Sequence, residues 1–224
     1  MDQTRANGPR TLPERLAAGE IVLLDAATGT DLDRRGLTTT LPLWSALGLI
    51  ERPDLVQAIH EDNLRAGADV VITDTFRTTG RTLEKAGMDP ARADALDALA
   101  VQLARAARTA TGREDALVAG SLAPLEDCYS PWLMPAPDAA LAEHRRQARN
   151  LAAAGADFIM AETMPCIAEA AIALQAATET GLPATVGFVC YPGRDGAAPR
   201  LMSGETLAEA VAAVEPLGPA AILV

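Results

Sequence analysis

Several residue types are scarce in this chain of 224 residues. Aromatic side chains make up 3% of it, cysteine occurs three times, and lysine occurs once, as Lys85. The cysteines, Cys128, Cys166 and Cys190, are odd in number and far apart. This pattern does not indicate a disulfide framework and fits a reducing compartment. No apolar run approaches the ~18 residues of a membrane span, and no signal-peptide pattern stands at the N-terminus. We therefore expect a cytoplasmic protein with no membrane partner.

Positive charge is also in short supply. The chain has 19 lysine and arginine residues against 30 aspartate and glutamate residues, which gives a formal net charge of −11. A surface of that sign repels phosphate backbones, so we expect no nucleic-acid partner. Lys85 lies in a polar segment outside any predicted strand. This position argues against a Schiff-base aldolase, whose chemistry needs a lysine at a strand end.

Six short apolar runs predict β-strands. Continuous aliphatic runs are typical of parallel strands that are buried on both faces. The intervals between them carry helical patterns, so repeated βα units predict an α/β protein with a parallel sheet. Six such units are about three quarters of a (β/α)8 TIM-type barrel. The predicted strands lie near 21–25, 69–73, 116–121, 157–162, 184–190 and 220–224, and the predicted helices include 53–66, 91–110, 138–154 with Asp138 as N-cap, and 167–180.

The chain contains no low-complexity linker, so it predicts one folded domain. Residues 1–11 are polar and predict a flexible N-terminal arm, and 12–224 predict the β/α domain. If the fold is a barrel, two βα units are missing from its C-terminal side. We therefore expect an incomplete barrel whose uncovered strand favours association, with a homo-oligomer as one outcome.

Three of the apolar runs end on a carboxylate, namely Asp25, Asp74 and Glu162. Barrels and open α/β sheets place their chemistry at the carboxyl ends of parallel strands. These acids, together with Thr75, are therefore the best pointers to an active site. Each also has a structural explanation: Asp25 as a turn former, Asp74 as a helix cap, and Glu162 as a cap or the partner of an arginine.

Other rare residues have structural interpretations that compete with functional ones. Trp44, Tyr129 and Trp132 lie in long loops, where aromatic faces either hold a cationic ligand or pin the loops to the rim; we favour pinning. His60 and His144 have no partner at metal-ligand spacing and are interpreted as packing or surface residues. The cysteines form no close pair of the kind that zinc sites use, so we predict no metal ligand among them.

Four segments in collinear order resemble the homocysteine S-methyltransferase family. The resemblance covers the chain from about Ile21 onward, with Ala26 where the family usually has glycine. It implies a (β/α)8 barrel that transfers a methyl group to the homocysteine thiol and gives methionine, the donor being a sulfonium, a quaternary ammonium or similar. The segments are Asp25 to Gly36, Pro53 to Phe76, Ala119 to Pro124 and Ala154 to Pro165.

The resemblance also implies roles for individual residues. Glu162 would hold the ammonium of homocysteine, Asp25 and the backbone of Ala26 and Ala27 would orient the substrate, and Thr75 would line the same pocket. No catalytic residue is assigned. The family holds Zn²⁺ with three cysteines, one just after the sixth strand and an adjacent pair later, and these ligands have no counterpart in this chain.

An alternative function uses the same barrel without its zinc site. The chain would then be a non-catalytic protein that binds an amino acid or depends on a partner. The sequence leaves open the methyl donor, the oligomeric state, zinc binding and the activity of the 224-residue form.

Overall fold

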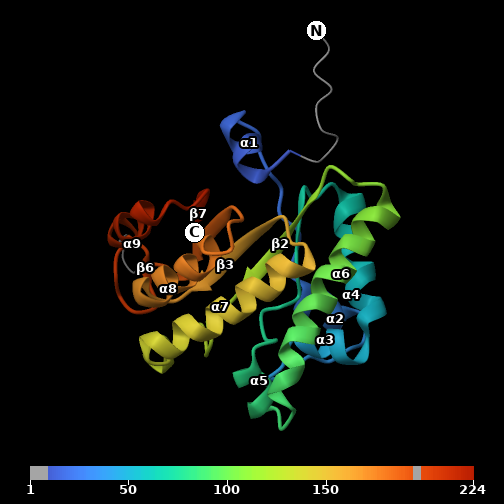
Figure 1. Ribbon diagram of the computed structural model, residues 1–224, viewed down its shortest axis with the longest axis horizontal. Coiled ribbons are helices and arrows are strands. Elements are labelled where there is room, and N and C mark those ends of the chain that lie inside the picture. The colour runs from blue at the N-terminus through green and yellow to red at the C-terminus, as the bar shows by residue number, and fades with distance from the viewer. Residues whose placement is uncertain (1–9, 194–197) are drawn as a thin grey trace.

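The computed structural model describes residues 10–193 and 198–224. Its centre is a five-stranded parallel sheet in which strands adjacent in the sheet are in chain order (Figure 1). Strands that follow one another across a sheet in chain order are typical of a barrel wall, whereas in a doubly wound sheet the order of the strands reverses at a switch point. The predicted α/β fold with a parallel sheet is therefore confirmed. The strands are β1 (Val70–Ile72), β2 (Leu117–Leu122), β3 (Phe158–Met164), β4 (Ala184–Phe188) and β7 (Ala221–Leu223).

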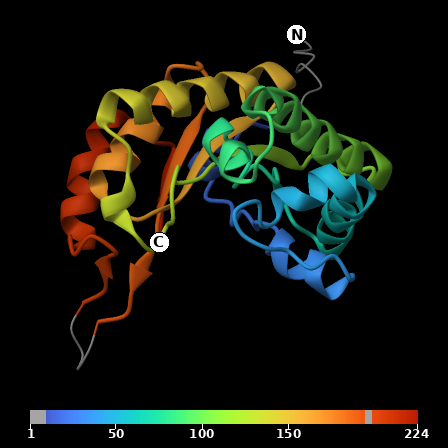
Figure 2. The same ribbon diagram turned by 90° about the horizontal axis from the view of Figure 1, so that it is seen from below.

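The longer helices cover the outer face of this sheet. Figure 2 shows them as an arc, from α4 in cyan to α9 in red, with the strands on its concave side. These helices are α4 (Pro53–Ala66), α6 (Ala93–Thr111), α7 (Pro137–Ala154), α8 (Ile167–Thr178) and α9 (Leu207–Val214). The shorter elements are α1 (Leu12–Ala17), α2 (Thr28–Arg34), α3 (Ala46–Glu51), α5 (Gly80–Lys85), the 3₁₀ turns η1 (Pro90–Arg92), η2 (Pro131–Leu133) and η3 (Glu215–Leu217), and the hairpin strands β5 (Cys190–Tyr191) and β6 (Arg200–Leu201).

Strands β2 and β4 are buried on both faces, as the continuous apolar runs predict, whereas the edge strand β7 is half-buried. Alternate strand residues point outward and pack with the helices, as Val71, Val118 and Ile159 do. Their neighbours Val70 and Phe158 point to the other face, where they pack with α1. In the described part of the chain no helix combines the length and apolar character needed to cross a membrane.

The prediction of a strand at 21–25 is wrong, because this segment is not a regular strand. It forms only an isolated parallel bridge between Leu24 and Val70. The carbonyl of Leu23 accepts hydrogen bonds from the N–H groups of Asp69 and Val70, at 2.8 and 3.1 Å. Within the described residues no strand pairs with its other edge, and Ile21 is 87% exposed. The apolar pattern predicted a strand buried on both faces. The segment instead pairs along one edge, and its first side chain stays exposed.

Two predicted element boundaries are also wrong. Helix α7 begins at Pro137 and its N-cap is Ala136, which makes no side-chain hydrogen bond, so Asp138 is not the cap. Proline fits the first helical position because it has no N–H to satisfy there. The strand predicted at 184–190 is β4, which ends at Phe188. Cys190 therefore does not end it but begins the hairpin strand β5.

Helix α4 has the predicted bounds. Its buried face carries Val56, Ile59 and Leu64, whereas Ala66 at its end is exposed. Residues 1–9 of the predicted N-terminal arm lie outside the described residues. The last residue of that arm, Thr11, caps α1 through a capping box with Glu14.

Packing between β2 and α7 supplies a test of the fold. A Cβ added at Gly120 would lie 3.0 Å from the Cβ of Leu151 and 3.1 Å from the Cδ1 of Ile159. We expect Gly120→Ala to lower the free energy of unfolding by about 1–3 kcal/mol, because overpacking a dense core shifts its neighbours.

Gly187 in β4 is the matched control, since its nearest neighbour would be Leu223 at 3.5 Å, an ordinary contact. Urea unfolding of both variants measures the difference. Equal stability of Gly120→Ala and Gly187→Ala would contradict the packing described here.

Candidate active site

A cavity of about 650 Å³ opens at the carboxyl end of the sheet. Its wall combines the turn at 25–29, the end of β1 with the loop after it, and the end of β3. The loops at 41–45 and 127–129 contribute the rest of the lining. Four of the five predicted substrate-binding residues, Asp25, Ala26, Ala27 and Glu162, therefore lie around one space. The parallel sheet brings them together because its strands all end at the same edge.

Asp25 lies beside the end of β1. Its carboxylate accepts the backbone N–H of Ile72 at 2.9 Å, and its side chain is 3% exposed. The pKa of Asp25 is raised to about 7, chiefly by burial; the hydrogen bond from Ile72 opposes this rise, and the charge of Glu162 adds to it. His60 approaches Asp25 at 3.9 Å, but burial lowers the pKa of His60 to about 4. A neutral imidazole at that distance does not compensate the carboxylate.

Asp74 follows β1 by two residues and is also buried. Burial raises its pKa to about 6, a hydrogen bond from Ser45 opposes the shift, and the charge of Glu162 adds to it. Its Oδ2 atom has no hydrogen-bond partner among the described residues. Asp74 therefore lines the cavity as an acid, and the next helix, α5, is capped by Thr79 instead.

Glu162 lies inside β3, where the strand is irregular. The register with β4 shifts between Ala161 and Met164, and Thr163 has a φ of 58°. A bulge of this kind re-aims side chains, and here both Glu162 and Thr163 face the cavity while Met164 returns to the core. A non-glycine residue at positive φ is a strained position of the sort found at functional sites.

Ser121 of β2 is the partner of Glu162. Its hydroxyl donates to the Oε1 of Glu162 at 2.5 Å. Burial raises the pKa of Glu162, and the hydrogen bond from Ser121 opposes that shift. Among the described residues, no lysine or arginine forms an ion pair with Asp25, Asp74 or Glu162. Three buried acids without a cation give the cavity a strong attraction for a positively charged group.

Ala26 and Ala27 lie in the cavity wall, whereas Thr75 lies behind it. The N–H of Ala26 donates to the Oδ1 of Asn63 at 3.4 Å, and Ala27 is the N-cap of α2. Thr75 is buried outside the cavity lining, and its hydroxyl donates to the carbonyl of Ser121 at 2.8 Å. Thr75 thereby braces the end of β1 against β2.

The rare aromatic residues separate into two groups. Trp44 and Tyr129 line the cavity, whereas Trp132 is 76% exposed and lies outside the lining. The ring of Trp44 meets Phe76 edge to face, with centroids 5.6 Å apart. Gly29 is in contact with Trp44, since a Cβ there would lie 2.9 Å from the indole. The prediction that aromatic residues only pin loops is therefore too simple for Trp44.

The described residues do not offer a zinc site. They contain no group of three or more histidine, cysteine, aspartate or glutamate side chains placed to hold a metal ion. Cys128 lines the cavity, and burial raises its thiol pKa. Cys166 and Cys190 lie outside the lining. We therefore derive no chemistry through a metal from these residues.

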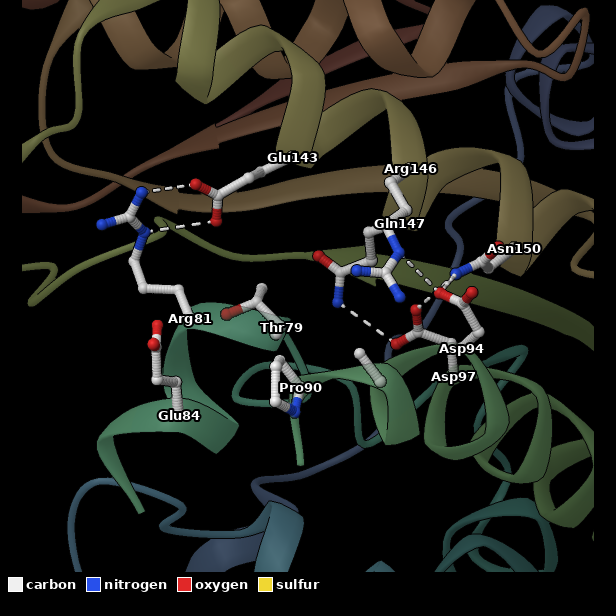
Figure 3. Close-up of a pocket in the computed structure, with 12 residues that line it drawn as sticks. Thr79, Arg81, Glu84, Pro90, Asp94, Asp97, Glu143, Arg146, Gln147 and Asn150 are labelled. Atoms are coloured by element: carbon white, nitrogen blue, oxygen red, sulfur yellow. Dashed lines mark hydrogen bonds and ion pairs between the residues drawn. The ribbon is translucent and has the colours of Figure 1, made fainter. Parts of the chain in front are cut away.

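A second cavity of about 280 Å³ lies between α5, α6 and α7 (Figure 3). Its arginines are paired with acids, Arg146 with Asp94 at 2.8 Å and Arg81 with Glu143. Gln147 reaches from α7 and donates to the carbonyl of Thr75 at 3.0 Å. Gln147 thus supports the loop after β1 from outside the sheet through its amide nitrogen, whereas its Oε1 has no hydrogen-bond partner among the described residues.

Several residues of the site were not predicted from the sequence. Ser121 was within a segment that resembles the family, and a polar side chain in a buried strand was the available signal. Phe76 and Arg77 line the cavity immediately after Thr75, and Thr163 lines it after Glu162. No periodic or motif signal distinguished these three, because their positions depend on the loop after β1 and the bulge in β3.

Comparison with known proteins identifies the family. A family model described as homocysteine S-methyltransferase matches residues 22–224. Homocysteine S-methyltransferase of Escherichia coli (strain K12) is 36% identical over 165 residues, which cover 67% of this chain and 52% of that protein. Homocysteine S-methyltransferase YbgG of Bacillus subtilis (strain 168) is 30% identical over 194 residues, covering 79% of this chain and 60% of that protein.

A solved structure agrees with these matches. The metallated form of homocysteine methyltransferase MmuM from Escherichia coli has a TM-score of 0.78 at 32% identity, covering 92% of this chain and 75% of that chain. This chain spans between 52% and 60% of the length of the two curated relatives named above. The match over nearly all of its residues shows that the chain belongs to the homocysteine S-methyltransferase family.

Proposed function

We propose that this chain binds homocysteine in the cavity at the carboxyl end of its sheet and serves in its S-methylation to methionine. The observation that carries the proposal is the convergence of Asp25, Asp74 and Glu162, buried and without a cationic partner among the described residues. An amino-acid ammonium is the cation such a site attracts, because a desolvated carboxylate gains most from a charged hydrogen-bond donor. Membership of the family supplies the reaction.

The proposed reaction transfers a methyl group from a sulfur or nitrogen atom of the donor to the sulfur atom of homocysteine. The thiolate sulfur of homocysteine attacks the methyl carbon of an onium donor, and a new carbon–sulfur bond forms. The bond from that carbon to the donor sulfur or nitrogen breaks, and its electron pair stays with the departing neutral donor. The proton of the thiol is released beforehand, since the thiolate is the nucleophile.

In this proposal the residues of the chain act by binding and orientation. Glu162 takes the ammonium, Ser121 holds the carboxylate of Glu162, and Asp25 and Ala27 shape the turn beside the substrate. Thr75 acts indirectly, through the brace between β1 and β2. The three scattered cysteines, which fit a reducing compartment, and the family support a cytoplasmic role in methionine biosynthesis with small-molecule partners.

Isothermal titration of homocysteine into the 224-residue chain tests the proposal directly. Binding that is competed by methionine would support it, and methionine formation from an added onium donor would establish catalysis by this chain. Binding without methionine formation would favour the non-catalytic amino-acid-binding function. Absence of homocysteine binding would refute the proposed function.

Glu162→Gln is expected to weaken homocysteine binding at least about tenfold, because hydrogen bonds to charged groups contribute about 1.5–3 kcal/mol. The amide keeps the size of the side chain but loses its charge. Glu51→Gln, an exposed substitution at the end of α3, is the control and should bind as the unaltered protein does. Equal affinities of the two variants would remove Glu162 from the site.

Ser121→Ala is expected to weaken homocysteine binding more at pH 6 than at pH 8. Loss of the hydroxyl removes the hydrogen bond that opposes the raised pKa of Glu162, so the pKa rises further and less carboxylate remains ionised at low pH. Thr185→Val is the matched control, since the buried hydroxyl of Thr185 has no partner among the described residues. A loss of affinity that is the same at both pH values would contradict this role.

Asp25→Asn tests the ionisation of the empty cavity through stability. The folded-state pKa of Asp25, about 7, lies above the ordinary value of 3.8, so the folded state retains a proton that the unfolded state releases. This contribution to stability is complete below the ordinary pKa and is lost as the pH rises to about 7, by up to about 1.4 kcal/mol for each pH unit.

Relative to Asp25→Asn, the unaltered protein should therefore lose stability between about pH 4 and pH 7 and remain level above that range. Urea unfolding at several pH values gives the difference. A difference that does not depend on pH would show that Asp25 titrates normally in the folded protein.

A further inference from the structure

Asp97 is a buried acid that lies outside the cavity at the carboxyl end of the sheet. It projects from α6 into the crevice between α5, α6 and α7, and only 2% of it is exposed (Figure 3). In the described part of the chain its carboxylate forms no ion pair, and Arg146 in the same crevice pairs with Asp94. Burial raises the pKa of Asp97 to about 6. A carboxylate is costly to bury in this way unless hydrogen bonds compensate it.

Three neutral side chains donate hydrogen bonds to this carboxylate. The hydroxyl of Thr78 donates to Oδ1 at 2.5 Å, the amide of Gln147 donates to the same oxygen at 3.4 Å, and the amide of Asn150 donates to Oδ2 at 3.2 Å. These bonds oppose the rise of the pKa, to which the charge of Asp94 adds. Thr78 belongs to the loop after β1, and Gln147 donates to the carbonyl of Thr75 in that loop at 3.0 Å. The buried acid thus orients both the loop and the α7 side chain that binds it.

The same loop holds Ser121 of β2 by a closed set of hydrogen bonds. The hydroxyl of Thr75 donates to the carbonyl of Ser121 at 2.8 Å, and the N–H of Ser121 donates to the hydroxyl of Thr73 at 3.0 Å. The two threonine hydroxyls lie 2.9 Å apart, and Thr73 is the donor between them because Thr75 gives its proton to Ser121. The hydroxyl of Ser121 in turn donates to Glu162. A continuous series of contacts therefore runs from Asp97 to Glu162.

We propose that Asp97 is a positioning residue for Glu162, which acts through the loop after β1 and through Ser121. This inference rests on the proposed function and adds to the site a residue that lies outside the cavity lining. Hydrogen bonds to a charged acceptor are shorter and stronger than those to a neutral one, so an ionised carboxylate fixes the loop firmly. The loop then fixes the backbone of Ser121, and a displaced Ser121 no longer holds the carboxylate of Glu162 at 2.5 Å.

The titration of Glu162 tests this inference in the absence of any ligand. Asp97→Asn removes the charge and places an amide N–H among side chains that themselves donate, so one of those donors loses its acceptor. We expect the substitution to raise the pKa of Glu162, because the hydrogen bond from Ser121 that lowers it is weakened. Carbon-13 NMR of the 224-residue chain with labelled glutamate measures this pKa, and Glu162→Gln assigns the signal. Asp25 and Asp74, the acids that respond to the charge of Glu162, are present in each of these variants.

A double-mutant comparison separates this role from a general loss of stability. Asp97→Asn should raise the pKa of Glu162 in the otherwise unaltered chain and leave it unchanged in Ser121→Ala, because the bond through which Asp97 acts is then absent. Glu84→Gln, an exposed acid of the same crevice, is the matched control and should leave the pKa of Glu162 in place. An equal rise in both backgrounds, or a rise in neither, would overturn the inference.

Thr78 supplies a second pair of variants that leaves the carboxylate of Asp97 in place. Thr78→Val removes the hydroxyl and keeps the shape of the side chain, so it should raise the pKa of Glu162. Thr78→Ser keeps the hydroxyl and should restore the pKa found in the unaltered chain. The same pKa in Thr78→Val and Thr78→Ser would contradict the series of contacts described here.

Homocysteine affinity is measured separately, by isothermal titration at pH 6. We expect Asp97→Asn to weaken binding about three- to tenfold and Glu84→Gln to leave it unchanged. A raised pKa of Glu162 with unchanged affinity would show that Asp97 does not serve substrate binding, which would overturn that part of the inference. Failure of the unaltered chain to bind homocysteine would refute the proposed function, whereas the NMR titration would still decide whether Asp97 positions Glu162.

Discussion

The desolvation of three carboxylates at one edge of a parallel sheet is the constraint on which the site depends. Asp25, Asp74 and Glu162 come from segments that are far apart in the sequence, and burial raises the pKa of each. A buried charge without a partner destabilises a fold, so burial favours the protonated form of these acids until a cation is supplied. The empty cavity therefore attracts a positively charged group.

The rest of the structure holds these acids in position. The N–H of Ile72 fixes Asp25, Ser121 fixes Glu162, and the bulge in β3 turns Glu162 and Thr163 toward the cavity. Further out, Gln147 of α7 holds the loop after β1 through the carbonyl of Thr75. The helical layer therefore contributes to the site without touching the cavity.

Family membership and geometry address different parts of the function. The family model identifies the family, whereas in our proposal the charges of the cavity recognise an amino acid. The described residues do not assemble a metal site, so none of the roles proposed for them involves zinc. In that proposal the described side chains bind and orient the substrate, and none of them is assigned the activation of its thiol.

Sequence alone determined the parallel α/β fold, the bounds of α4 and the convergence of the strand-end acids. These features follow from local apolar periodicity and from the common direction of parallel strands. Only the tertiary structure decided that 21–25 pairs on one edge, that Thr75 braces two strands and that Ser121 and Arg77 belong to the site. These positions depend on a bulge, a loop path and contacts between distant segments, and such long-range geometry leaves no periodic trace along the chain.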